Sequence, residues 1–187
     1  MIAIVDYGMG NVLSLKNSLE YLGENAEICD SVDEISKADK VILPGVGAFP
    51  DCIKALKEKN LINILNKKAL VDKIPFLGIC LGMQVMASYG EEAGGCSGLG
   101  WFDAKVLKIK PSSLVTKIPN VGWETISIKQ ENPLLDLSKS NLDFYFVHSY
   151  SMICNCPDDV VSEYKMEESN IVASIQKENI FGTQFHP

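Results

Sequence analysis

The chain has 187 residues, of which 47% are hydrophobic and 22% are charged, a composition typical of soluble globular proteins. Seventeen basic against 24 acidic residues give a net charge of −7 without a basic cluster, so we expect no nucleic-acid partner. No apolar run reaches the length of a membrane span and no signal-peptide pattern opens the chain, so we expect a cytoplasmic protein without a membrane partner.

Six cysteines are present, and in a chain of this kind we expect them to be reduced thiols. The pair Cys154 and Cys156 is a weak metal signal, because structural zinc sites need further ligands and the chain has only two histidines. We therefore expect neither a metal nor another cofactor.

Strands and helices alternate along the first half of the chain. Apolar residues at helical spacing begin at Val12, and Gly23 is a typical residue after a helix end. Two more helical pieces are expected between residues 53 and 65, and Ser31 with Glu34 has the spacing of a capping box. Such alternation predicts a parallel sheet with right-handed crossovers. The strands expected here are 2–6, 26–29, 41–43 and 75–79.

The second half consists of short apolar runs with short connections, several of them alternating with period two. No linker or repeat divides the halves, so we expect one α/β domain over residues 1–187. Its central sheet should be mostly parallel with helices on both faces, and a smaller antiparallel portion should be added to it. The strands expected in this half are 101–109, 124–128, 143–152, 160–165, 171–176 and 180–185.

The residues around Cys80 carry the strongest chemical signal. Cys80 lies where an apolar strand ends and a helix begins, between Gly78 and Gly82. This pattern is typical of a nucleophile elbow, a sharp turn that exposes a reactive side chain. A helix N-terminus behind the sulfur favours the thiolate, so Cys80 is the predicted nucleophile.

A cysteine nucleophile needs a base, and only His148 and His186 carry an imidazole. His186 follows a predicted strand, and reactive groups of parallel sheets gather at the carboxyl ends of strands. His148 lies inside a predicted strand, where a structural, hydrogen-bonded histidine is the better interpretation. The run Pro44-Gly-Val-Gly47 also follows a strand, and its amides could hold an oxyanion. By itself this run is a weak signal that a simple turn explains, but the three strand-end motifs together are specific.

The motifs Pro-Gly-Val-Gly, Gly-Ile-Cys-Leu-Gly-Met-Gln and Gln-Phe-His-Pro, in this order along the chain, resemble those of the class I (triad) glutamine amidotransferases. The start Asp-Tyr-Gly-Met-Gly-Asn and the segment Pro-Asn-Val-Gly-Trp are more narrowly similar to the HisH-type glutaminase subunits of imidazole glycerol phosphate synthase. The resemblance covers essentially the whole chain and implies the flavodoxin-like fold of that family.

The resemblance also implies roles for individual residues. Cys80 would attack the amide of glutamine, and His186 would serve as acid and base. Val46 and Leu81 would supply the oxyanion-hole amides. The substrate-binding residues implied are Gly47, Gln84, Glu92, Tyr145, Ser149 and Tyr150.

The resemblance further implies a partner, a HisF-type (β/α)₈-barrel cyclase that receives the ammonia, with Asn11, Asn120 and Trp123 as interface candidates. The default interpretation of a lone tryptophan such as Trp123 is a core residue. In the family a glutamate follows the His-Pro pair and orients the histidine, and a closing helix comes after it. Since the sequence stops at Pro187, we expect a domain without its C-terminal end and a 187-residue form with severely weakened glutaminase activity.

Three alternatives stay open at this point. Asn120 stands where the histidine-pathway subunits usually have a histidine, which suggests a paralogous subunit for amidination of bacterial surface sugars. The missing glutamate is compatible with a non-catalytic docking subunit. A different cysteine enzyme with a similar elbow is the third, and it explains the three motifs together less well.

Overall fold

The computed structural model describes residues 1–110, 117–135 and 142–187. The α-helices are α1 (Val12–Tyr21), α2 (Val32–Ser36), α3 (Phe49–Glu58), α4 (Ile62–Asn66) and α5 (Leu81–Gln84); η1 (Lys67–Val71) is a π-helical segment that continues α4, and η2 (Glu92–Gly94) and η3 (Pro157–Asp159) are short 3₁₀ helices. The strands are β1 (Ile2–Val5), β2 (Ala26–Cys29), β3 (Lys40–Leu43), β4 (Phe76–Ile79), β5 (Ala87–Gly90), β6 (Cys96–Ser97), β7 (Phe102–Lys108), β8 (Asn120–Ile128), β9 (Asp143–His148), β10 (Tyr150–Cys154), β11 (Val160–Met166), β12 (Ser169–Lys177) and β13 (Ile180–Thr183).

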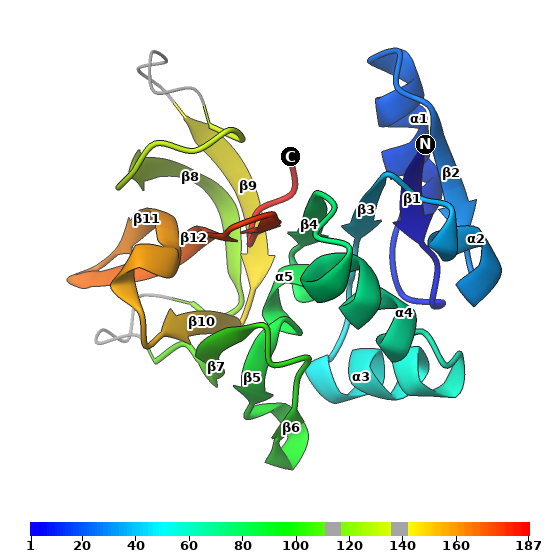
Figure 1. The fold of residues 1–187 in the computed structure, drawn as a ribbon. Helices are drawn as coiled ribbons and strands as arrows, with labels where there is room; N and C mark the ends of the chain where they lie inside the picture. Colours follow the sequence, from blue (N-terminus) through cyan, green and yellow to red (C-terminus); the bar gives the residue numbers. More distant parts are fainter. Residues whose placement is uncertain (111–116, 136–141) are drawn as a thin grey trace.

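A mixed sheet runs through the whole molecule in the order β2-β1-β3-β4-β13-β12-β11-β8-β9 (Figure 1). From β2 to β13 neighbouring strands are parallel, and from β13 to β9 they are antiparallel. The parallel half has the strand order 2-1-3-4 followed by a last strand, as in flavodoxin-like folds. The predicted α/β architecture is therefore confirmed, and the expected antiparallel portion extends the central sheet itself.

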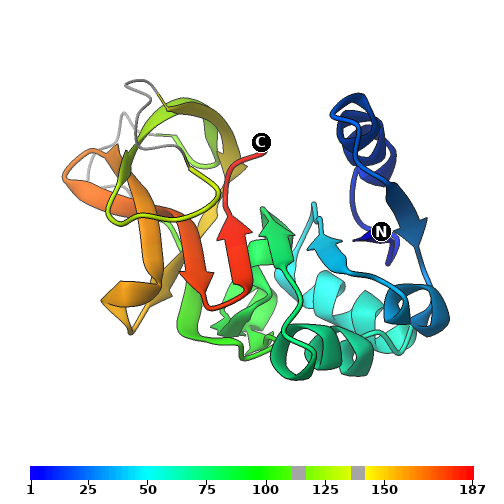
Figure 2. The same ribbon diagram turned by 45° about the horizontal axis from the view of Figure 1, so that its top comes forward.

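Helices cover both faces of the parallel half (Figure 2). On one face α3 and α4 bury Leu56 and Leu65 in the main core. On the other face α1 lays Leu15 and Leu19 against the apolar side of β1, β3 and β4. No residue of α1 is fully buried, so this face is covered much less completely than the first.

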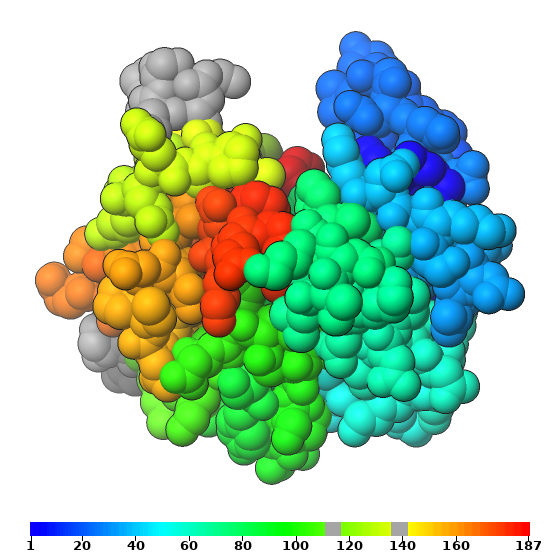
Figure 3. Space-filling model, in the orientation of Figure 1, coloured from blue at the N-terminus to red at the C-terminus, as the bar shows by residue number. Residues whose placement is uncertain are grey.

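The last strand, β13, lies in the middle of the molecule although it comes near the end of the chain (Figure 3). It pairs with β4 in parallel and with β12 in antiparallel fashion. Phe185, just after β13, stacks on Phe144 with 4.0 Å between ring centroids, in an aromatic core that also contains Phe146 and Tyr164. This packing holds the segment after β13 in place.

Two parts of the second half differ from the sequence prediction. The expected strand 143–152 is two strands that separate at Ser149: β9 pairs with β8 in the main sheet, and β10 pairs with β7 in a smaller sheet ordered β10-β7-β5-β6. Strands β5 and β6 were not predicted. Extended backbone has the same period-two pattern in either sheet, so the change of sheet leaves no mark on the pattern.

The helices and the cysteines bear on two further expectations from the sequence. None of the helices among the described residues is long and apolar enough to cross a membrane. All six cysteines are free thiols, as expected for reduced cysteines.

Candidate active site

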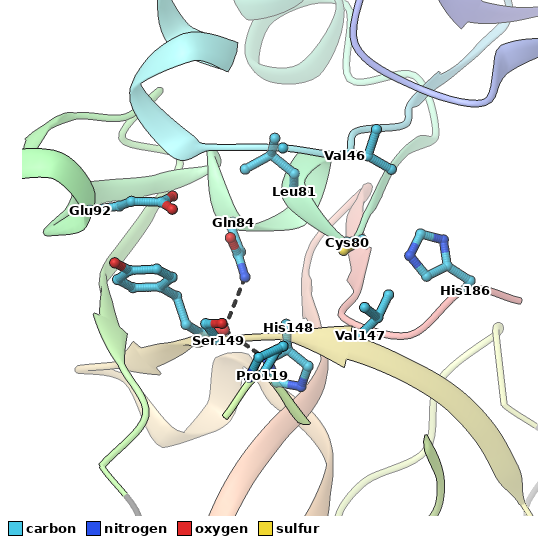
Figure 4. A pocket seen from close by; sticks show the side chains of 12 residues that line it. Val46, Cys80, Leu81, Gln84, Glu92, Pro119, Val147, His148, Ser149 and His186 are labelled. Carbon is cyan, nitrogen blue, oxygen red and sulfur yellow. Dashed lines mark hydrogen bonds between the residues drawn. The ribbon is translucent and has the colours of Figure 1, made fainter. Parts of the chain in front are cut away.

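Three predicted motifs meet because their strands are neighbours. Strands β3, β4 and β13 are adjacent and parallel, with Leu43 opposite Gly78 and Ile79 opposite Thr183. The carboxyl ends of the three strands therefore lie at one edge of the sheet. Cys80 follows β4, Val46 follows β3 and His186 follows β13, so strand order alone brings them together (Figure 4).

Cys80 occupies a strained turn of the backbone. Its φ of 54° and ψ of −111° lie outside the regions that non-glycine residues prefer, and such strain is typical of nucleophile elbows. The turn is tight against β3, because a Cβ atom on Gly82 would overlap the carbonyl oxygen of Leu43. Glycine at this position is what allows α5 to start directly behind the sulfur.

The environment of the Cys80 thiol contains opposing effects. Burial raises its pKa to about 11, because a thiolate is poorly solvated there, while the backbone N–H of Leu81 and the amide of Gln184 counteract this. The sequence-based expectation that the helix N-terminus favours the thiolate is not met in the free protein. The helix α5 has only four residues, and the effect of burial is larger.

His186 lies on the opposite wall from α5, and its ring faces the Cys80 side of the site (Figure 4). Its backbone N–H donates to the carbonyl of Tyr145 at 3.2 Å, which attaches the segment after β13 to β9. Burial lowers the pKa of the imidazole, because the charged form would be poorly solvated. The ring is therefore neutral at pH 7 and able to accept a proton.

The segment after β3 is a turn whose residues Val46 and Gly47 are exposed. Gly47 has a φ of 107°, which favours glycine, and a Cβ atom there would press on Met9. Val46 is half exposed at the rim of the site. The hydroxyl of buried Tyr7 donates to the carbonyl of Pro44 at 2.8 Å and holds the start of this loop.

A cavity of about 400 Å³ lies between these elements, large enough for an amino-acid side chain and backbone. At its far end a carboxylate oxygen of Glu92 accepts a hydrogen bond of 2.8 Å from the backbone N–H of Phe49, at the start of α3. Of the residues predicted from the sequence, the cavity is lined by Val46, Gly47, Cys80, Leu81, Gln84, Glu92, Ser149, Tyr150 and His186 (Figure 4).

Sequence reasoning missed several residues that shape this cavity. Pro119 and Val147 line it, and so does His148, whose ring nitrogens contact the Tyr150 carbonyl and the Tyr164 hydroxyl. Buried Gln184 lies behind it, 3.6 Å from the Cys80 sulfur. The amide of Gln184 was visible in the Gln-Phe-His-Pro motif, but no sequence spacing indicates where that side chain points.

The remaining predicted residues lie outside the cavity. Tyr145 packs edge-on against Trp123, with 5.8 Å between ring centroids, and Trp123 is 72% exposed, so its default interpretation as a core residue is wrong. Asn120 is on the other face of β8 and donates to the hydroxyl of Tyr164 at 3.1 Å. Asn11 caps α1 by accepting from the backbone N–H of Ser14.

Residues 3–187 match the family model of class-I glutamine amidotransferases. A relative from Methanococcus maripaludis, called imidazole glycerol phosphate synthase subunit HisH 2, is 47% identical over all of this chain and 91% of its own length. A Campylobacter jejuni relative, called subunit HisH 1, is 43% identical over all of this chain and 92% of its own.

Solved structures agree at the level of the fold. A crystal structure of a glutamine amidotransferase superimposes with a TM-score of 0.76 at 16% identity, covering all of this chain and 90% of the other. The Thermotoga maritima structure of PurLQS has a TM-score of 0.75 at 18% identity over 86% of its chain and all of this one. With the nucleophile turn, the neighbouring histidine and the extent of these matches, the chain belongs to the class-I glutamine amidotransferase family, among its HisH-type members.

Proposed function

We propose that this protein is the glutaminase subunit of an imidazole glycerol phosphate synthase. It hydrolyses glutamine to glutamate and ammonia, and the ammonia passes to a cyclase partner in histidine biosynthesis. The observation that carries the proposal is that Cys80 on its strained turn and neutral His186, whose ring faces it, both line a cavity of amino-acid size. The names of the HisH relatives supply the pathway.

The first half of the reaction forms a thioester. The Cys80 sulfur attacks the side-chain amide carbon of glutamine while the thiol proton moves to His186. The amide oxygen becomes an oxyanion, which the backbone N–H groups of Leu81 and Val46 stabilise. The carbon–nitrogen bond then breaks, and His186 returns its proton to the nitrogen, which leaves as ammonia.

The second half regenerates the enzyme. His186, again neutral, takes a proton from water as the water oxygen attacks the thioester carbon. The carbon–sulfur bond breaks, the sulfur recovers a proton from the imidazolium, and glutamate leaves. Because burial lowers the pKa of His186, the imidazole is in its proton-accepting form before each half-reaction.

The far end of the cavity suits the amino-acid head of the substrate. One oxygen of Glu92 is held by the Phe49 amide, and the carboxylate lines the cavity, where an ammonium group would be its natural counter-charge. Gly47, Gln84, Ser149 and Tyr150 complete the binding walls in this proposal.

The partner would dock on the exposed apolar face of β8 and β9. In the register of these strands Val121 stands opposite Val147 and Trp123 opposite Tyr145, and all four side chains are exposed. Val147 lines the cavity as well, so this face is continuous with the site. We assign the face to a HisF-type (β/α)₈-barrel subunit, with Trp123 at its centre and Asn11 and Asn120 as further candidates, although the side chain of Asn120 points to Tyr164.

We further propose that residues 1–187 form one glutamine amidotransferase domain that acts in the cytoplasm. Support for one domain comes from the main core cluster, which combines residues of the parallel half, such as Leu43, with residues of the small sheet, such as Phe102.

The test of this function is reconstitution of the chain, extended by the glutamate that follows the His-Pro pair in the family, with the cyclase encoded in the same organism; the 187-residue form is measured beside it. The complex should convert glutamine to equal amounts of glutamate and cyclase product, and Cys80→Ser should abolish glutamine use while free ammonia still supports the cyclase. Failure of the pair to use glutamine would overturn the proposal. Product formation only with a cyclase that acts on surface sugars would favour the paralogous role instead.

A further inference from the structure

A chain of buried hydrogen bonds connects the proposed substrate-binding wall to the nucleophile. Nε2 of Gln84 donates both of its hydrogens, to the carbonyl of Tyr150 at 3.0 Å and to Oε1 of Gln184 at 2.9 Å. Nε2 of Gln184 in turn donates to the Cys80 sulfur at 3.6 Å. Gln84 is 6% exposed, where it lines the cavity, and Gln184 is completely buried, so the bonds made by Gln184 are shielded from water.

The carbonyl oxygen of Tyr150 fixes the orientation of both amides, because a carbonyl can only accept hydrogen bonds. The Tyr150 carbonyl has no hydrogen to give, so Gln84 must present its nitrogen to it. The second hydrogen on that nitrogen then requires an acceptor, and Oε1 of Gln184 is the atom within reach. Gln184 is thereby obliged to turn its N–H group toward the Cys80 sulfur.

The Tyr150 carbonyl is itself fixed from a second side. Nδ1 of His148 lies 2.8 Å from it and must be the protonated nitrogen, because a carbonyl accepts. Nε2 is then the acceptor for the Tyr164 hydroxyl at 3.0 Å, and the amide of Asn120 donates to that hydroxyl. Each hydrogen bond from Asn120 through Tyr164, His148 and the Tyr150 carbonyl to Gln84, Gln184 and Cys80 thus has an assigned donor and acceptor.

We propose that Gln184 is a positioning residue for the nucleophile, whose side-chain N–H stabilises the Cys80 thiolate and is held in the donating orientation by Gln84. The inference deepens the proposed glutaminase function and depends on it for its biological meaning. It assigns a task to an amide that has no place in the thioester chemistry itself. It also connects the wall that would bind the substrate head to the charge on the attacking sulfur.

Burial makes such a donor valuable at this position. The sulfur is nearly enclosed, so a thiolate there depends on fixed donors, and among the described residues only the Leu81 N–H donates to it besides Gln184. Among the described residues, the titratable groups near the sulfur or lining its cavity are Tyr7 after β1, Glu92 in η2, His148 in β9, Tyr150 in β10 and His186 after β13. Tyr7 stays neutral because burial strongly raises its pKa, so it adds no charge near the sulfur.

The experiment is the pH dependence of Cys80 alkylation by iodoacetamide in the full chain. Only a thiolate reacts, and mass spectrometry of the Cys80 peptide separates it from the exposed thiol of Cys156. In Gln184→Met the midpoint should move upward by about one pH unit, which lowers the rate at pH 8 about tenfold. Gln176→Met is the matched control, because Gln176 lies on the neighbouring strand β12 and its amide, as far as the described residues show, donates to the carbonyl of Glu178 and to no group of the site.

A second variant protects the test against misfolding of Gln184→Met. Gln84→Met leaves Gln184 in place but removes the donor that orients it, so we expect a smaller upward shift of the alkylation midpoint. Overlap of the wild-type profile with that of either folded variant would overturn the proposal. The assay needs no turnover, so a glutaminase-inactive complex with shifted midpoints would refute the proposed function and leave this inference standing.

Discussion

The backbone N–H of Cys80 donates a 2.7 Å hydrogen bond to the carbonyl of Thr183, across the boundary between β4 and β13. The strained turn of the nucleophile is therefore fastened to the strand that carries His186 three residues later. Moving the two reactive side chains apart would require breaking this bond and the pairing of β4 with β13, so the pair is positioned before any substrate enters.

Replacing the nucleophile should separate chemistry from binding. In Cys80→Ser, with the cyclase bound, we expect glutamate release to fall by at least about a thousandfold, because a serine hydroxyl is not ionised here. Cys156→Ser is the matched control, since Cys156 is exposed and away from the cavity, and its activity should equal that of the wild type. Residual activity above a tenth in Cys80→Ser would place the nucleophile elsewhere.

The acidic limb of the activity profile should report His186. Burial lowers the pKa of this imidazole below its ordinary value of 6.5, so the proton-accepting form persists into mildly acidic solution. In the complex we expect kcat/KM for glutamine to fall only below pH 6.5. A midpoint above pH 7 would contradict the assignment, and His186→Asn should remove this limb together with most of the activity.

The stability of the fold should decrease in acid partly through His148. Burial lowers the pKa of His148 in the folded state, so between that value and 6.5 the unfolded chain binds more protons. The free energy of unfolding should therefore decline as the pH falls below 6.5, by at most about 1.4 kcal/mol for each unit of lowering. Urea titrations at pH 7.5 and 5.5 measure this decline.

His148→Gln is the variant that isolates this contribution, and its decline should be smaller than that of the wild type. His186 has a lowered pKa of the same sign, so His186→Gln must be measured beside it. Equal declines in wild type and His148→Gln would show that His148 does not contribute.

The close approach of α5 to β3 should make Gly82 irreplaceable. In Gly82→Ala the new methyl group overlaps the Leu43 carbonyl, and backbone atoms cannot move aside as a side chain can. We expect a loss of about 3 kcal/mol in the free energy of unfolding by urea denaturation. Gly122→Ala in β8 is the control: nothing lies within 4 Å of its Cβ position, and the change should stay within about 0.5 kcal/mol.

The exposed face of β8 and β9 should be tested with Trp123→Ala. The side chain is 72% exposed, so its removal should leave the urea midpoint almost unchanged. Binding of the cyclase should weaken at least about tenfold in calorimetric titration, since large aromatic side chains dominate such interfaces. Tyr21→Ala is the control, because Tyr21 is 91% exposed on α1 and outside the proposed face; equal binding by both variants would remove Trp123 from the interface.

The parallel half of the fold and the reactive residues could be predicted from the sequence because they follow local rules. Apolar strands that alternate with amphipathic helices produce a parallel sheet, and residues at strand ends share one edge. Cys80, Val46 and His186 each directly follow a strand or lie within a few residues of its end, so their meeting needed no knowledge of side-chain packing.

What the sequence could not predict depends on contacts between distant segments. The change of sheet at Ser149 is invisible to period-two patterns, and it places Ser149 and Tyr150 at a corner of the cavity. Whether the Asn120 side chain points to solvent or to Tyr164 depends on which face of β8 packs against the aromatic core. The contact of Gln184 with Cys80 depends on the order in which strands pair, 104 residues apart along the chain.

The central place of β13 has a consequence for how the protein is made. During synthesis β1, β3 and β4 leave the ribosome long before residues 180–183. Until β13 is made, the edge of β4 that pairs with it in the folded protein has no partner strand. The Cys80 sulfur lies near neither His186 nor the Gln184 amide until β13 has inserted between β4 and β12. Assembly of the catalytic machinery is thus deferred until residues 180–186 have been synthesised, and the emerging chain cannot consume glutamine before β13 has joined the sheet.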